Sequence, residues 1–206
     1  MTQIYDLKGF IRGSSRHVLL SVGLTLAACT NLGTTLNSDR IERAFGNYGV
    51  EILRADETRR VTSLYSADRT SKTTRTYAVV QYRETPNSLI AAEHANIIDG
   101  GSIGTTFREA GWEIDKQHIF IGELEVPKTY TEIADVMRIS LPELLATHVY
   151  LFNVRKDERT VQYATITEIH HPDYLDEIAL QGIYGEIIFD DSNRDGLHDF
   201  IGLPNQ

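Results

Sequence analysis

Three consecutive stretches decide the fold: THVYLFNV (147–154), RKDER (155–159) and TVQYATITEI (160–169). The first and the third are rich in β-branched and aromatic residues, which favour strands. The stretch between them is short and fully charged, as a surface turn requires. Two strand-like runs joined by such a loop are typical of a β-hairpin. These residues therefore predict two neighbouring antiparallel strands.

The rest of the chain continues this pattern, with helices inserted between the strands. Further strands are predicted at 48–53, 60–65, 75–82, 119–126 and 184–189. Helices are predicted at 39–45, capped by Ser38 and closed by Gly46, and at 89–98, 102–110, 130–137 and 173–180, the last started by Pro172. Strands in runs with hairpin-length loops are typical of the α+β class. We expect a mainly antiparallel sheet with helices packed on one face, in a single domain of residues 38–206.

The first 28 residues are organised like an export signal. Residues 1–17 are polar and carry three basic side chains, residues 18–28 (VLLSVGLTLAA) are uncharged, and Cys29 follows as the only cysteine. A basic start and a short apolar run that ends in small residues are typical of a secretory signal peptide. The run is too short for a spanning helix, which needs about 20 apolar residues. This pattern predicts a signal peptide over residues 1–28.

The end of the apolar run, LAAC (26–29), resembles the lipobox of bacterial lipoprotein precursors. The resemblance implies cleavage before Cys29 and acylation of its thiol, with palmitate as a typical chain. Two or more acyl chains anchor a protein stably, at about 0.8 kcal/mol per buried CH₂. Thr30 in place of Asp implies a lipid anchor in the outer membrane, with residues 29–37 as a tether in the periplasm. The alternatives are an uncleaved or differently cleaved signal, and a buried helix with an incidental cysteine.

The acidic composition limits the partners. The chain has 20 basic and 29 acidic residues and a net charge of −9. Residues 1–28 hold three of the basic residues and one of the acidic ones, so their removal leaves a net charge of −11. Nucleic acid binding and polybasic docking on anionic lipid both need a basic surface, which argues against them. Envelope proteins, small molecules and divalent cations remain as partners.

The stretch DSNRDGLHD (191–199) resembles calcium loops of the Asp-x-Asn-x-Asp-Gly type, as in EF-hands and dockerins. The ligands that it implies are Asp191, Asn193, Asp195, Asp199 and, through its carbonyl, Leu197. Position twelve of the loop is Gly202 instead of the bidentate Glu of EF-hands, which predicts weak binding. Extracellular calcium modules work at roughly 10⁻⁴ to 10⁻³ M, so a weak site would still fill there. The alternative is an acidic turn, because turns favour Asp, Asn and Gly.

The stretch GGSIG (100–104) is a formal Gly-x-Ser-x-Gly motif. In α/β-hydrolases this motif places a nucleophilic serine on a turn from a strand to a helix. Here the residues before the motif are predicted to be helical, so the context differs. The favoured interpretation is a Gly-Gly turn between two helices with Ser102 as N-cap. A catalytic Ser102 is the alternative.

Glu168 and His170 are two residues apart on a predicted strand, so they project from the same face. Together with His94 or His148 they form a candidate transition-metal site or acid–base pair. The alternative is a polar strand end, where His171 or Pro172 opens the next helix.

No catalytic pattern in the chain has its full context. The sequence therefore favours a membrane-anchored lipoprotein of the bacterial envelope that acts as a binding or interaction module, with a structural calcium loop. The alternative is a small periplasmic hydrolase or metal-dependent enzyme that uses Ser102 or the Glu168/His170 pair.

Overall fold

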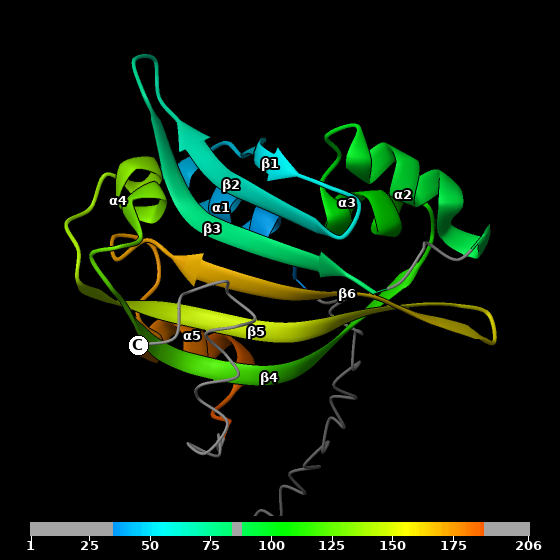
Figure 1. The fold of residues 1–206 in the computed structure, drawn as a ribbon. Coiled ribbons are helices and arrows are strands. Elements are labelled where there is room, and N and C mark those ends of the chain that lie inside the picture. Colours follow the sequence, from blue (N-terminus) through cyan, green and yellow to red (C-terminus); the bar gives the residue numbers. More distant parts are fainter. Residues whose placement is uncertain (1–34, 84–87, 188–206) are drawn as a thin grey trace, which may run out of the picture. The chain divides into compact units, whose positions relative to one another are not determined.

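The computed structural model describes residues 35–83 and 88–187. They form one six-stranded sheet with helices around it (Figure 1). The strands are β1 (Gly49–Ala55), β2 (Arg59–Ala67), β3 (Lys72–Tyr82), β4 (Glu113–Val126), β5 (Glu143–Lys156) and β6 (Arg159–His170). The helices are α1 (Asn37–Phe45), η1 (Ser88–Ile90), α2 (Ala91–Ile98), α3 (Ile103–Glu109), α4 (Thr131–Met137) and α5 (Glu177–Tyr184).

The sheet joins two three-stranded meanders in the order β1-β2-β3-β6-β5-β4, and every neighbouring pair is antiparallel. The predicted hairpin is confirmed, and its two strands are β5 and β6. Strand β6 also pairs with β3, at the centre of the sheet. The α+β class and the antiparallel sheet are confirmed as well. Cys29 and the stretch 191–199 lie outside the described residues.

The sheet has two different faces, because successive side chains of a strand point to opposite sides. On β3, Tyr77 and Val79 pack in one apolar cluster with residues of α4. Val80 packs in a second cluster, with residues of α2 and α3. Helices α1 and α5 contact the same side as α2 and α3, through Thr76 and His148 respectively. We call this side the helix-rich face and the opposite one the α4 face.

Strand β4 changes phase at a β-bulge. His118 lies opposite Tyr150 and Phe120 lies opposite Val149, so Ile119 is an extra residue without a cross-strand partner. A bulge shifts the alternation of side chains by one position. Even-numbered residues therefore face the helix-rich side before the bulge, and odd-numbered ones face it afterwards.

The turn between α2 and α3 explains the two glycines of the GGSIG stretch. Gly100 has φ +114°, a conformation that only glycine adopts readily. A Cβ on Gly101 would lie 2.9 Å from the carbonyl oxygen of Asn96 and even closer to its side chain. Both glycines therefore serve a tight connection from helix to helix, as the favoured interpretation predicted.

The start of the domain differs from the prediction. The N-cap of α1 is Leu36, and Ser38 lies inside the helix. Leu36 and Asn37 are buried, so the predicted tether 29–37 extends too far into the domain. The physical reason is packing, since Asn37 donates a hydrogen bond to Thr76 Oγ1 at 3.1 Å. Gly46 ends α1 as predicted, in the left-handed conformation.

The helix predicted at 173–180 is also wrong in position. Residues after His170 form a turn in which Tyr174 N–H donates to the carbonyl of His171 at 2.8 Å. Helix α5 begins only after Asp176, whose side chain accepts a hydrogen bond from Ala179 N–H at 2.7 Å. Tyr184, predicted to start a strand, is therefore the last residue of α5.

In the described part of the chain, no helix is long and apolar enough to cross a membrane.

Candidate functional site

A pocket of about 70 Å³ opens on the helix-rich face, between the sheet, α1 and the start of α3. Its wall is apolar over much of its area, with side chains such as Leu36, Val80 and Phe152. Polar and charged groups are set into this wall. Six of them matter for the argument below: Tyr48, Arg60, Ser102, Lys116, Tyr150 and Glu168.

Glu168 lies at the centre of the sheet and is only 5% exposed. Strand pairing places it opposite His148 on β5, with His148 Nδ1 3.8 Å from Glu168 Oε2. The hydroxyl of Tyr150 donates to Glu168 Oε1 at 3.3 Å. Burial would by itself raise the pKa of Glu168, but Lys116 and then His148 and His170 outweigh it and hold that pKa well below its usual range. Glu168 is therefore an ionised hydrogen-bond acceptor at neutral pH.

Lys116 on β4 is the buried cation that faces this carboxylate. It is 9% exposed, and its Nζ lies 4.3 Å from the ring centroid of Tyr150 and 5.7 Å from that of Tyr184. Burial lowers the pKa of Lys116, and Glu168 partly restores it. Among the described residues Lys116 makes no direct ion pair, so it meets Glu168 only through longer-range attraction. The two charges are separated and both line the pocket.

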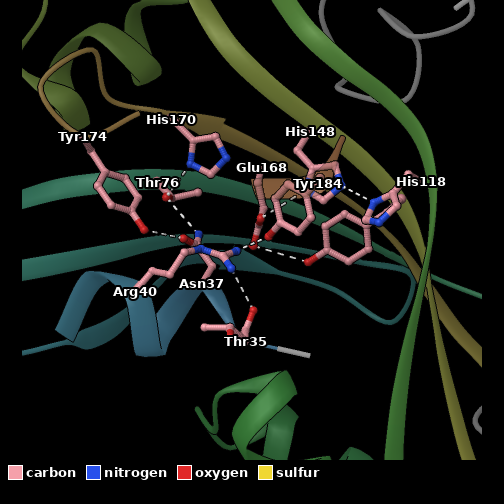
Figure 2. Close-up of polar contacts among 11 residues, drawn as sticks. Thr35, Asn37, Arg40, Thr76, His118, His148, Glu168, His170, Tyr174 and Tyr184 are labelled. Carbon is pink, nitrogen blue, oxygen red and sulfur yellow. Dashed lines mark hydrogen bonds and ion pairs between the residues drawn. The ribbon is translucent and has the colours of Figure 1, made fainter. Parts of the chain in front are cut away.

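A chain of histidines connects Glu168 with the edge of the sheet. Figure 2 shows His118, His148 and Glu168 in sequence, with His118 Nδ1 2.8 Å from His148 Nε2. Burial lowers the pKa of His148 to about 4, although Glu168 opposes the shift. Burial and the Lys116 charge also lower the pKa of the partly exposed His118. Both imidazoles are therefore neutral at pH 7.

His170 belongs to a separate chain of hydrogen bonds that fastens α1 to the sheet (Figure 2). His170 Nδ1 lies 3.0 Å from Thr76 Oγ1, which accepts from Asn37, and Tyr174 OH donates to Asn37 Oδ1 at 2.8 Å. Burial lowers the pKa of His170 to about 3, against the attraction of Glu168. This histidine is neutral and structural in its contacts.

Arg40, on α1, contacts residues on both sides of this region. Its guanidinium donates to the carbonyl of Thr35 at 2.9 Å and to the hydroxyl of Tyr184, and it lies 4.9 Å from the centroid of that ring. The ring of Tyr184 in turn packs 4.2 Å from that of His148. These contacts hold α1 and α5 beside the histidine chain.

Arg60 on β2 is a second buried cation at the pocket, only 2% exposed. It donates to the carbonyls of Ile97 at 2.6 Å and Gly101 at 2.9 Å, at the C-terminal end of α2. A cation is favourable there because the helix end carries partial negative charge. Its buried Nε has no hydrogen-bond partner among the described residues.

Ser102 lines the pocket, but its surroundings are not those of a nucleophile. It is the N-cap residue of α3, as predicted, although its side chain makes no capping hydrogen bond. In the described part of the chain the hydroxyl that reaches Ser102 Oγ is that of Tyr48, at 3.4 Å, and no histidine bonds to it. Burial raises the pKa of Tyr48 to about 12, so Tyr48 is a neutral donor. A nucleophilic serine needs a base within hydrogen-bond reach.

Glu168 and His170, the predicted transition-metal or acid–base pair, do project from one face of β6, on the helix-rich side. His148 joins Glu168, whereas His94 lies elsewhere and bonds to the hydroxyl of Tyr163 at 2.9 Å. Within residues 35–83 and 88–187 no group of three or more His, Cys, Asp or Glu side chains is placed to hold a metal ion.

Of the six polar pocket residues named above, four were not predicted as site residues: Tyr48, Arg60, Lys116 and Tyr150. Lys116 was missed because the predicted strand began at 119, whereas β4 begins at Glu113. The stretch EIDKQH (113–118) is too polar to resemble a buried strand. Arg60 begins the predicted strand 60–65, and a basic residue within a strand is the signal that the sequence offered for it.

Comparison with models of known protein families and with curated proteins gave no match for this chain. The geometry of the pocket is therefore the main guide to function.

Proposed function

We propose that the chain is a lipid-anchored binding module of the bacterial envelope, and that its pocket binds a small polar molecule. The observation that carries the proposal is the buried, separated pair of Lys116 and Glu168 in the pocket wall. Burying a charge without a close partner is costly. Such groups are retained where a ligand completes their interactions.

Binding is favoured over catalysis by the electrostatics of the site. A general base works best when its pKa lies near the working pH. The pKa of Glu168 lies well below its usual range, so it is a poor base and a good fixed acceptor. Ser102 lacks a basic partner among the described residues.

A thermal-shift panel of small carboxylates, amines, sugars and phosphates tests the pocket. A ligand present at ~100 times its Kd should raise the Tm of the purified protein by about 5–10 °C. Ser102→Leu, which adds a larger side chain to the pocket wall, should abolish that shift. Thr105→Leu, on the same helix but not part of the wall, is the matched control. A panel that leaves the wild-type Tm unchanged, or shifts Ser102→Leu equally, contradicts the proposal.

Radiolabelled palmitate tests the anchor. Cells that express the wild type should incorporate label into the protein, and cells that express Cys29→Ser should not. Equal labelling of both proteins would rule out lipid attachment at this residue.

Calorimetry with calcium tests the C-terminal loop. The wild type should give binding heat at millimolar calcium, and Asp195→Ala should give none. If the two proteins behave alike, the loop binds no calcium.

The enzyme alternative retains one supporting observation, because Ser102 and Glu168 line the same pocket. Its test is hydrolysis of p-nitrophenyl acetate by the wild type and by Ser102→Ala. Equal rates for the two proteins exclude Ser102 as the nucleophile.

A further inference from the structure

We propose that the ligand of this pocket is a small carboxylic acid with a hydrogen-bond donor on the carbon next to its carboxylate, that is, a 2-hydroxy or 2-amino acid. This inference rests on the proposed binding function and names its ligand class. Four properties of the pocket support it: the sign of its charges, the separation of Lys116 from Glu168, its unfilled hydrogen bonds and its size.

The sign of the charges favours an anion. Two buried cations, Lys116 and Arg60, line the pocket, and among the described residues Glu168 is the one carboxylate in its wall. The pocket therefore carries one excess positive charge. A ligand carboxylate offsets this charge locally, and the neutral hydroxyl of Tyr48 is a further donor for that group.

The separation of the charges favours a ligand with two kinds of polar group. A carboxylate beside Lys116 satisfies the cation, whereas Glu168 needs a donor. The Glu168 carboxylate offers about four lone pairs. Among the described residues Tyr150 donates to it, and His148 Nδ1 lies 3.8 Å away. A ligand hydroxyl or ammonium fills one of the remaining positions, and charge-assisted hydrogen bonds of this kind are the strong ones.

The unfilled hydrogen bonds favour the same two kinds of ligand group. Arg60 Nε is a buried donor and Glu168 Oε2 a buried acceptor, and neither has a hydrogen-bond partner among the described residues. Buried polar atoms in native proteins nearly always have partners. The donor belongs to the cation Arg60 and the acceptor to the anion Glu168. A ligand that carries both an acceptor and a donor has a group of the right kind for each of these atoms.

The size of the pocket sets the scale of the ligand. One water needs roughly 10–15 Å³ of such volume, so the cavity of about 70 Å³ holds about five to seven water-sized groups. A three-carbon hydroxy or amino acid has six non-hydrogen atoms. Its methyl group suits the apolar wall formed by Val80, Phe152 and Ile166.

Titration calorimetry of the purified full chain at pH 7 tests the inference with four small ligands. Lactate and alanine carry both groups, propionate lacks the donor and ethylamine lacks the carboxylate. We expect lactate or alanine to bind at least about tenfold more tightly than propionate or ethylamine, since a hydrogen bond to a charged group is worth that factor or more. Lactate best identifies a hydroxy acid, and alanine best identifies an amino acid.

Two variants assign the roles of the charges. Lys116→Met should weaken the binding of lactate and alanine at least about tenfold, while the exposed Lys128→Met should leave it unchanged. Glu168→Gln should reduce the advantage of alanine over propionate to about threefold or less, and the exposed Glu125→Gln should preserve it. The wild-type comparison needs no variant, so the test stands even where a buried-charge variant does not fold.

Three results overturn the inference: propionate binding as tightly as lactate and alanine, ethylamine binding best, or no binding of any of the four. The thermal-shift panel then separates the two levels of the argument. If another class of ligand raises the wild-type Tm and Ser102→Leu loses that shift, the pocket is a binding site for a different ligand. If the panel also gives no shift, the proposed function fails with the inference.

Discussion

The two faces of the sheet use the same strands for different purposes. On the α4 face Val79, Val149 and Ile169 pack against one another and against α4. On the helix-rich face the next residues along β5 and β6 are His148 and Glu168, both buried. Apolar burial stabilises the fold by about 25 cal/mol per Å², whereas buried polar groups cost free energy unless they are paired. Both faces bury apolar clusters that stabilise the domain, but the helix-rich face also uses part of that stability to keep charges in a pocket.

The largest effect should come from a cavity on the α4 face. Ile169→Ala removes a side chain that is 1% exposed and should lower the free energy of unfolding by about 2–5 kcal/mol. Urea denaturation measures this loss. Ligand binding should persist at temperatures where the variant is folded, because Ile169 points away from the pocket. A variant that keeps wild-type stability would contradict the division of roles between the faces.

Replacement of the buried charge pair should have the opposite sign. The double variant Lys116→Met, Glu168→Met exchanges two buried charges for apolar side chains, which is commonly neutral or stabilising by about 1–4 kcal/mol. Its urea midpoint should equal or exceed that of the wild type, while the ligand-induced Tm shift disappears. A strong loss of stability would mean that the charges hold the fold together.

The pH dependence of stability should come mainly from the helix-rich face. The pKa of a histidine is about 6.5 in an unfolded chain, while the pKa of His148 is about 4 and that of His170 about 3 in the fold. Below pH 6.5 the unfolded chain binds protons at these histidines that the folded chain does not, so their contribution to stability is complete above that pH and is lost with decreasing pH. Each histidine contributes a slope of up to about 1.4 kcal/mol per pH unit.

His170→Gln isolates one of these contributions. The free energy of unfolding of this variant should be measured by urea denaturation between pH 6 and pH 4.5. Its slope against pH should be smaller than that of the wild type by an amount that corresponds to about one bound proton. The slope reports proton uptake alone, so it is independent of the hydrogen bond to Thr76 that the substitution also alters. An unchanged slope would show that His170 is protonated in the folded protein.

The smallest effect should come from the polar edge of the α4 face. Tyr77 donates a hydrogen bond to Glu132 on α4 at 2.9 Å, and Arg54 lies 3.3 Å from its hydroxyl. Tyr77→Phe keeps the ring and removes these contacts, so it should cost about 0.5–1.5 kcal/mol in chemical denaturation. A much larger loss would reveal a polar network that stabilises this face as well.

The same contrast explains which features the sequence could predict. The hairpin of β5 and β6 and the Gly100-Gly101 turn follow from local residue preferences, and both are confirmed. The common face of Glu168 and His170 follows from the period of a strand. The first half of β4 was missed because a strand that faces a polar pocket places Lys116 where a buried apolar residue is expected. The neighbours of Glu168 across the sheet depend on strand order and register, which local preferences do not specify.

The bulge at Ile119 gives β4 an unusual sensitivity to changes in length. Each half of the strand is in phase with its own part of the sheet only because one additional residue separates them. Deletion of that single residue would leave every remaining side chain chemically intact, yet it would turn one half over. Either Lys116 would leave the pocket and His118 would leave His148, or Phe120 and Leu124 would leave the apolar cluster beside α4. In genetic terms, the loss of one codon here would alter the molecule more than most amino-acid substitutions, so natural variation in this strand should occur by exchange of residues and not by insertion or deletion.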